Sequence, residues 1–351
     1  MKKIKITAIS IIVALLIGLI PISLTPKVAY AAEGGVGGQG KGGNTAPTVT
    51  AVTLVESGSE TEVTSMTPLS TYRVKVTAGD TNTIDDITEI EFHIYYSADG
   101  SNWDADALGI FKWTKSGDVW SRESGAYSTT WEVVSASSIS PSVFTSNSGD
   151  WYLAFKPGKL AQATATQTWY ASATARDENK NGSGSWATGS SMGAYAEIGF
   201  DSASLTLGDA TAGIEPGQTG YITVPVSNYL TAQVTTNKQY ALGVYSSANW
   251  TDGGSNIINL AGGTGVPAGS AQFNLEIDDQ KATTNNGPKT PQAVASSDTT
   301  ITGLGTLSRV TTNANASEST GNNQFWMALS FSLAGIQEVN YSGTITFSVT
   351  N

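Results

Sequence analysis

Cysteine is absent from the 351 residues, and histidine occurs once, at His93. Without cysteine the chain has neither the disulfide bonds of small secreted domains nor thiolate metal ligands. A Ser-His-Asp triad or a hydrolytic zinc site would have to use this single imidazole. We expect His93 to face solvent, on the same strand face as Glu91. These absences argue against an enzyme, and we expect a non-catalytic protein.

Basic residues are also scarce, because 18 Lys and Arg stand against 29 Asp and Glu, for a formal net charge of -11. Nucleic acids and anionic membranes attract basic surfaces, so we expect the protein to bind neither. Charged residues make up only 13% of the chain, while glycine, hydroxyl and amide side chains are abundant. This composition is typical of an extracellular β protein. Its many carboxylates make divalent cations reasonable counter-ions.

Only one long apolar run occurs, from Ile6 to Ile20, between a basic start and the small-residue sequence that ends at Ala31. This order predicts a secretory signal peptide, residues 1–31, because the run of about 15 residues is shorter than the roughly 20 of a membrane span. Cleavage would remove four lysines and no acid, which changes the net charge from -11 to -15. We expect a secreted protein, extracellular or on the cell surface, with no transmembrane segment after cleavage.

The remainder of the chain shows strand patterns and no sustained helical period. Residues 32–47 are rich in glycine and predict a flexible linker. From residue 48 onward, short alternating segments recur between clusters of Gly, Asp, Asn, Ser and Pro. The chain is therefore predicted to be all-β, with two tandem β-sandwich domains over residues 48–196 and 197–351. Each domain is long enough to bury its own core.

The clearest predicted strand starts at Trp169. From there large or small apolar residues alternate with polar ones as far as Arg176, the period of two expected of a half-buried strand. The side that carries Trp169 and three alanines is predicted to face the core. The following segment, Asp177–Gly182, is composed of residues that favour a turn.

Two segments resemble the immunoglobulin-like modules of bacterial and archaeal surface proteins. Tyr95–Trp103 is similar to a strand, Asp-Gly turn and tryptophan hairpin of such modules, and Trp169–Asp177 is similar to their penultimate strand. The closing segment, Tyr341–Val349, looks like the last strand of β-sandwich modules in surface and fimbria-like proteins. The resemblance implies immunoglobulin-like sandwiches in a secreted surface protein, although the cysteine pair of antibody domains is absent.

One segment matches the first half of a calcium loop. Asp177, Asn179, Asn181 and Gly182 follow the pattern Asp-x-Asn-x-Asn-Gly, in which alternate side-chain oxygens bind one ion. Thr188 stands at the twelfth position, where a bidentate glutamate is expected. The same residues also suit an ordinary β-turn, so both interpretations stay open, and calcium is the only cofactor for which the sequence offers a pattern. A second acidic group lies at Asp80, Asp85 and Asp86.

Tryptophan, with nine residues, is the enrichment best suited to binding. Four tryptophans would form a stacking platform for sugar rings if they were exposed. They are Trp103, Trp113, Trp120 and Trp131. Packing in the core is the alternative. Glu89 and Glu91 lie two residues apart and could act as the paired acids of a glycosidase, or serve only as solubilising charge.

Asn-x-Ser/Thr sequences permit glycosylation at four positions. They are Asn181, Asn249, Asn315 and Asn340. Taken together, the patterns predict a secreted structural protein of the cell surface, a subunit of a surface layer or extracellular fibre. Its partners would be copies of itself or other cell-surface proteins and glycans. A carbohydrate-binding or adhesin module that uses the four tryptophans is the alternative, and a glycan-active enzyme is the third hypothesis.

Overall fold

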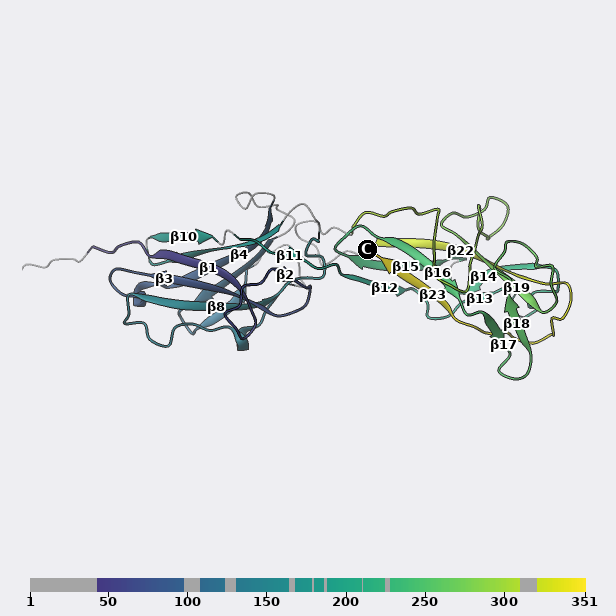
Figure 1. Ribbon diagram of the computed structural model, residues 1–351, viewed down its shortest axis with the longest axis horizontal. Helices are drawn as coiled ribbons and strands as arrows, with labels where there is room; N and C mark the ends of the chain where they lie inside the picture. Colours follow the sequence, from purple (N-terminus) through teal and green to yellow (C-terminus); the bar gives the residue numbers. More distant parts are fainter. Residues whose placement is uncertain are drawn as a thin grey trace, which may run out of the picture. The chain divides into compact units, whose positions relative to one another are not determined.

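The computed structural model describes residues 43–97, 108–123, 131–163, 168–178, 180–185, 188–209, 211–224, 228–309 and 321–351 (Figure 1). The predicted signal peptide and residues 32–42 of the predicted linker lie outside these ranges. The described residues form 23 strands and two short 3-10 helices, so the prediction of an all-β chain is confirmed. No helix within these ranges is long and apolar enough to cross a membrane.

Residues 48–185 form two antiparallel sheets, with the strand orders β1-β3-β8-β7 and β10-β9-β4-β5-β6. Their strands are β1 (Thr48–Glu56), β3 (Tyr72–Gly79), β4 (Glu89–Ser97), β5 (Leu108–Thr114), β6 (Val119–Arg122), β7 (Glu132–Val133), β8 (Ser148–Lys156), β9 (Thr168–Arg176) and β10 (Asn181–Ser185). A parallel pair and two 3-10 helices complete this part of the chain. They are β2 (Ser65–Met66), β11 (Ser191–Met192), η1 (Ile84–Asp86) and η2 (Ser135–Ser137).

The burial of β9 follows the alternation of its sequence. Its inward side chains are at most 2% exposed, and they are Trp169, Ala171, Ala173 and Ala175. The intervening side chains are partly exposed. The small side of this strand faces the core as predicted, because alanine lets the neighbouring large rings approach the sheet closely.

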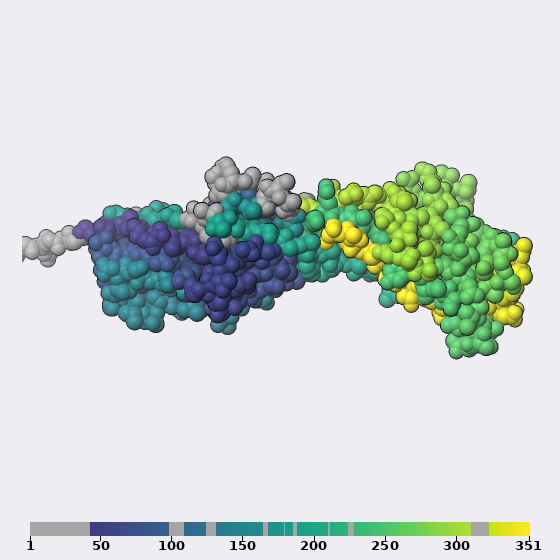
Figure 2. Space-filling model, viewed as in Figure 1, coloured from purple at the N-terminus to yellow at the C-terminus, as the bar shows by residue number. Residues whose placement is uncertain are grey.

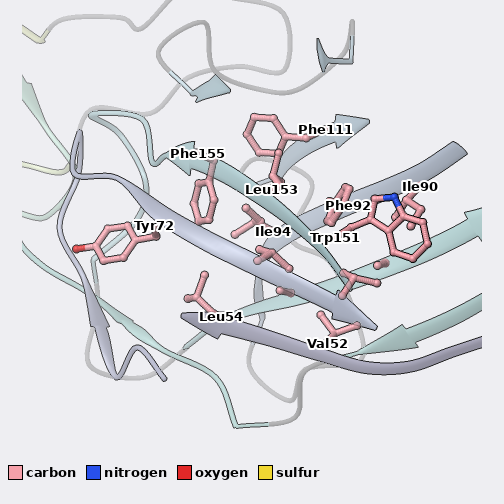
Figure 3. Packing of buried hydrophobic residues seen from close by; sticks show 14 of the residues in the cluster. Val52, Leu54, Tyr72, Ile90, Phe92, Ile94, Phe111, Trp151, Leu153 and Phe155 are labelled. Carbon is pink, nitrogen blue, oxygen red and sulfur yellow. The ribbon is translucent and has the colours of Figure 1, made fainter. Parts of the chain in front are cut away.

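A hydrophobic core lies between these two sheets, and aromatic rings cross it (Figure 3). Trp113 of β5 meets Trp151 of β8 edge-on, with 5.6 Å between the ring centroids. Phe111 of β5 lies 6.0 Å from Phe155 of β8. Such tilted aromatic pairs add to the stabilisation that area burial provides. Because each pair joins one sheet to the other, the rings fix how the two sheets face each other.

Residues 196–350 form a nine-stranded sheet and a three-stranded sheet, β21-β16-β23. Their strands are β12 (Ala196–Phe200), β13 (Thr206–Leu207), β14 (Thr219–Val224), β15 (Leu230–Thr236), β16 (Ala241–Ser246), β17 (Asn249–Thr251), β18 (Ile257–Leu260), β19 (Gln272–Asp278), β20 (Gln292–Ala293), β21 (Thr299–Thr300), β22 (Gly321–Phe331) and β23 (Ile345–Thr350). β22 is the shared strand of the larger sheet. Residues 321–325 pair with β15, and residues 326–331 pair with β19 and in part with β14.

A second hydrophobic cluster fills the space between the sheets of residues 196–350. Phe347 of β23, in the smaller sheet, contacts Phe325 of β22, in the larger sheet, with 5.4 Å between the ring centroids. The two clusters share no residue, and the chain passes from one to the other between Met192 and Ile198.

Asn237 joins three chain segments within the compact unit of residues 44–351. It lies between β15 and β16 and is fully buried. Its Nδ2 donates to the carbonyls of Ala161 (2.8 Å) and Gly193 (2.9 Å), and its Oδ1 accepts from the amide of Tyr195 at 2.7 Å. Its own carbonyl accepts from the amide of Ala163 at 3.1 Å. One side chain therefore satisfies three backbone groups that residues from both parts of the chain contribute.

Candidate functional site

The predicted calcium loop is a tight hairpin turn between β9 and β10. The amide of Asp177 donates to the carbonyl of Lys180 at 3.0 Å, and the amide of Lys180 donates to Asp177 Oδ1 at 2.6 Å. Asn181 already lies in β10, opposite Arg176, and Asn179 lies outside the described residues. Asn181 is therefore part of the sheet ladder, and its role as a calcium ligand stays a prediction.

Asp177 instead contacts the segment that leads into β1. Its carboxylate is 7% exposed, and its Oδ2 accepts from Asn44 Nδ2 at 2.9 Å. Lys180 Nζ donates to the backbone carbonyl of Asn44. A Cβ on Gly182 would lie 1.9 Å from the carbonyl oxygen of Pro47, so only glycine lets the two segments approach so closely. Figure 1 shows β10 beside β1 at this point.

The second predicted acidic group divides between two places. Asp80, directly after β3, is only 4% exposed, and its Oδ1 accepts from Thr45 Oγ1 at 3.3 Å and from the amide of Asn82 at 2.9 Å. Asp80 Oδ2 is buried and has no hydrogen-bond partner. Asp85 lies on the surface and pairs with Lys115 at 2.7 Å. Asp80 is thus the member of the group that is withdrawn from water.

The structure brings the two predicted calcium candidates together through two consecutive residues, Asn44 and Thr45. Asn44 contacts Asp177, and Thr45 contacts Asp80. Asn44 Oδ1, like Asp80 Oδ2, is buried without a hydrogen-bond partner. We call these four residues the Asp80–Asp177 junction. Within the described ranges, no group of three or more His, Cys, Asp or Glu side chains is arranged to hold a metal ion, so any ion here would depend partly on neutral oxygens.

The pair Glu89 and Glu91 lies on the outer face of the sheet that contains β4, among basic side chains. Arg176 Nε lies 3.3 Å from Glu89 Oε1, and Arg176 Nη2 lies 3.5 Å from Glu91 Oε2. Lys112 Nζ lies 3.5 Å from Glu89 Oε2. His93 Nε2 lies 2.5 Å from Glu91 Oε1, which confirms that these two residues share a face. The His93 side chain lies on the outer face, as predicted, but it is only 11% exposed because its neighbours cover it. The pair Glu89 and Glu91 therefore belongs to a salt-bridge network.

The described tryptophans of the predicted sugar platform are buried. Trp113, Trp120 and Trp131 are 0%, 8% and 4% exposed. Trp131 stacks on Phe155, with 6.0 Å between centroids, and Trp113 stacks on Phe144 at the same distance. The prediction of an exposed platform is wrong for these three residues, because their faces are covered by other rings. Trp103 lies outside the described residues.

A separate acidic pair, which the sequence reasoning missed, borders a hollow of about 190 Å³ beside β19. Asp278 Oδ2 accepts from the amide of Thr290, and its Oδ1 accepts from the amide of Gln280 at 3.3 Å. Burial, together with the neighbouring Asp278, raises the pKa of Asp279. Asp279 Oδ1 is buried without a hydrogen-bond partner. Two adjacent acids at the end of an alternating strand, Gln272–Asp278, were the sequence signal for this pair.

Two of the segments that resemble immunoglobulin-like modules are neighbours in one sheet. Tyr95 of β4 pairs with Tyr170 of β9, and their rings stack with 5.9 Å between centroids. No family model matches the chain, and no curated protein matches it. The assignment to immunoglobulin-like modules therefore stays a prediction.

Three of the four predicted glycosylation positions are described, and all three are exposed. They are Asn181, Asn249 and Asn340. Asn315 lies outside the described residues. Exposure is a requirement for a glycan acceptor, so the glycosylation prediction stays open at the three described positions.

Proposed function

We propose that this protein is a secreted, non-catalytic structural subunit of a cell-surface layer or extracellular fibre. In this proposal it consists of two β-sandwich domains, residues 48–196 and 197–351, whose copies join through sheet edges. The separation of the two hydrophobic clusters between Met192 and Ile198 supports the division into two domains. The scarcity of charge and the absence of cysteine suit a polymer held together by backbone pairing.

Two strands that pair on one side only carry the proposal. Among the described residues, β12 pairs only with β15, and β23 pairs only with β16. Phe200 of β12 contacts Phe347 of β23, with 5.1 Å between the ring centroids, so both edges lie on the same side of the second core. The C-terminal residues, coloured yellow, reach the surface on the face shown in Figure 2.

The edge strand β23 lacks the devices by which monomeric proteins avoid edge pairing, and β12 has few of them. Lysine, proline and bulges usually protect an edge strand, yet β23 (Ile-Thr-Phe-Ser-Val-Thr) contains neither a charged residue nor a proline. β12 has one charge, Glu197, which pairs with Lys159 at 2.7 Å. Phe200 is 37% exposed at the end of β12. A strand from a second copy would satisfy the free backbone groups and cover this ring.

A charge placed on either edge tests the proposal. Gly199 of β12 is suited to this, because a Cβ there would meet no atom within 4 Å. We expect Gly199→Lys and, on β23, Thr346→Lys to abolish the polymers that the unaltered protein forms, as seen by electron microscopy and light scattering. Thr264→Lys adds the same charge on an exposed loop and should leave the polymers intact.

Circular dichroism must show that all the variants retain their strand content. Monomeric particles of the unaltered protein under all solution conditions would contradict the proposal. Polymers that persist in both edge variants would show that copies join elsewhere.

A further inference from the structure

We propose that the Asp80–Asp177 junction binds a divalent cation of the calcium class. The ion would fasten the segment before β1 to the loops at the ends of β3 and β9. The site does not depend on the proposed structural function, because its evidence comes only from the contacts of Asn44, Thr45, Asp80 and Asp177.

The first argument is the state of Asp80. The residue is only 4% exposed. The donors to its Oδ1 are the neutral hydroxyl of Thr45 and the amide of Asn82. Among the described residues, no lysine or arginine forms an ion pair with Asp80, and its Oδ2 has no hydrogen-bond partner. A buried carboxylate is costly unless a positive charge compensates it. A bound cation provides that charge.

The second argument is the amide of Asn44. Its Nδ2 is committed to Asp177 Oδ2 at 2.9 Å, which fixes the orientation of the side chain. Its Oδ1 is buried and also lacks a partner. The two oxygens without a partner are therefore Asn44 Oδ1 and Oδ2 of Asp80, whose Oδ1 accepts from the adjacent residue Thr45. Asp177, which is 7% exposed, holds this amide, and its other oxygen, Oδ1, accepts from the amide of Lys180.

The chemistry of these groups selects the ion. Calcium binds six to eight oxygens from carboxylates, side-chain and backbone carbonyls and water, with flexible geometry. The junction offers two carboxylates, an amide oxygen and a hydroxyl, and it contains no histidine or cysteine that would favour zinc. Magnesium requires a nearly ideal octahedron and retains its waters, so it suits a crowded buried carboxylate less well. The short list of charged ligands predicts weak binding, as in extracellular calcium modules.

The arrangement also defines what the ion would do. Asn44 and Thr45 come from the segment before β1, whereas Asp80 and Asp177 belong to the two sheets of the first core. The end of β9 is already tied to the Asp80 loop, because the amide of Thr88 donates to the carbonyl of Arg176 at 2.9 Å. Calcium would therefore immobilise the segment before β1 on a preformed support.

Titration of the full protein with CaCl₂ tests the inference by isothermal calorimetry and by the thermal midpoint relative to EDTA. We expect one site and a higher midpoint in calcium, with a much smaller effect of MgCl₂. Asp80→Asn should weaken calcium binding at least tenfold. Asp85→Asn is the matched control, because Asp85 lies in the same loop but is exposed and pairs with Lys115; it should bind as the unaltered protein does.

A second variant and a local measurement guard against a loss of fold. Asn44→Ala removes one proposed ligand from an N-terminal segment and should also weaken binding. Hydrogen exchange of the amides of residues 44–48 should slow when calcium is added to the unaltered protein. The inference is overturned if calcium does not bind, or if Asp80→Asn and Asn44→Ala bind it as tightly as the unaltered protein does.

Discussion

Asn237 offers the sharpest test of what holds the described chain together. Asn237→Ala removes the side-chain partners of three backbone groups, the carbonyls of Ala161 and Gly193 and the amide of Tyr195. A buried polar group that loses its partner costs about 1–3 kcal/mol. Ala161 is buried, whereas Gly193 and Tyr195 are partly exposed, so water can replace some of the lost bonds. We therefore expect a loss of roughly 3–5 kcal/mol in the free energy of unfolding.

The assay is urea unfolding followed by tryptophan fluorescence, with the free energy obtained by linear extrapolation. Asn285→Ala is the matched control, because the Asn285 side chain is exposed and its Nδ2 donates to Tyr221 Oη at 2.9 Å. Its cost should stay below about 1 kcal/mol. If Asn237→Ala costs no more than Asn285→Ala, the three buried bonds do not stabilise the protein and the reasoning fails.

Two further predictions concern buried polar groups. Trp113 Nε1 donates to Asp118 Oδ1 at 2.6 Å, whereas Trp151 Nε1 is buried without a partner; Trp113→Phe should therefore cost about 1 kcal/mol more than Trp151→Phe in chemical unfolding, and equal costs would contradict this. Burial and the neighbouring Asp278 raise the pKa of Asp279 above its ordinary value of 3.8. The protonated carboxyl is therefore favoured in the folded state, and the protein is more stable below pH 3.8 than at a pH above the folded pKa of Asp279, where this carboxyl is ionised. Asp279→Asn should therefore raise the thermal midpoint at pH 7, with the gain disappearing below about pH 3.8; a gain that is the same at every pH would show that ionisation is not its cause.

The predictions from sequence succeeded where local alternation determines burial. In β9, the small and polar residues repeat with a period of two, and the small side is the buried side. The structure has strands throughout residues 48–351, where short alternating segments between turn-forming residues predicted them. Such information is contained within a few consecutive residues.

The strand β10 was missed for a tertiary reason. Asn181–Ser185 alternates Gly with Asn and Ser, which have a low strand propensity, and it was predicted to begin as a turn. The segment is a strand because the glycines let the residues before and within β1 approach it. A Cβ on Gly182 or Gly184 would lie 1.9 Å from Pro47 or 2.7 Å from Val49. The residues around β10 alone do not show that β1 approaches so closely, because Pro47 and Val49 are distant in the sequence.

The candidate cation site shows the same limit. Asp80 and Asp177 were each selected as an acidic group near a turn, but they are far apart in the chain. Their relation depends on Asn44 and Thr45, which belong to a stretch predicted to be a flexible linker. Composition could not reveal these contacts, because the surrounding glycines predict a flexible segment although Asn44 and Thr45 each bind a specific partner.

The late position of β22 in the chain affects when the hydrophobic cluster of residues 196–350 can form during synthesis. β14, β15 and β19 all emerge from the ribosome before β22, and each pairs with it. Until residues 321–331 have emerged, these three strands lack their common neighbour and expose apolar side chains and backbone groups. A nascent chain therefore holds an incomplete, aggregation-prone layer from the synthesis of β14 until that of β22, and a holding chaperone that binds extended segments would protect it during that interval.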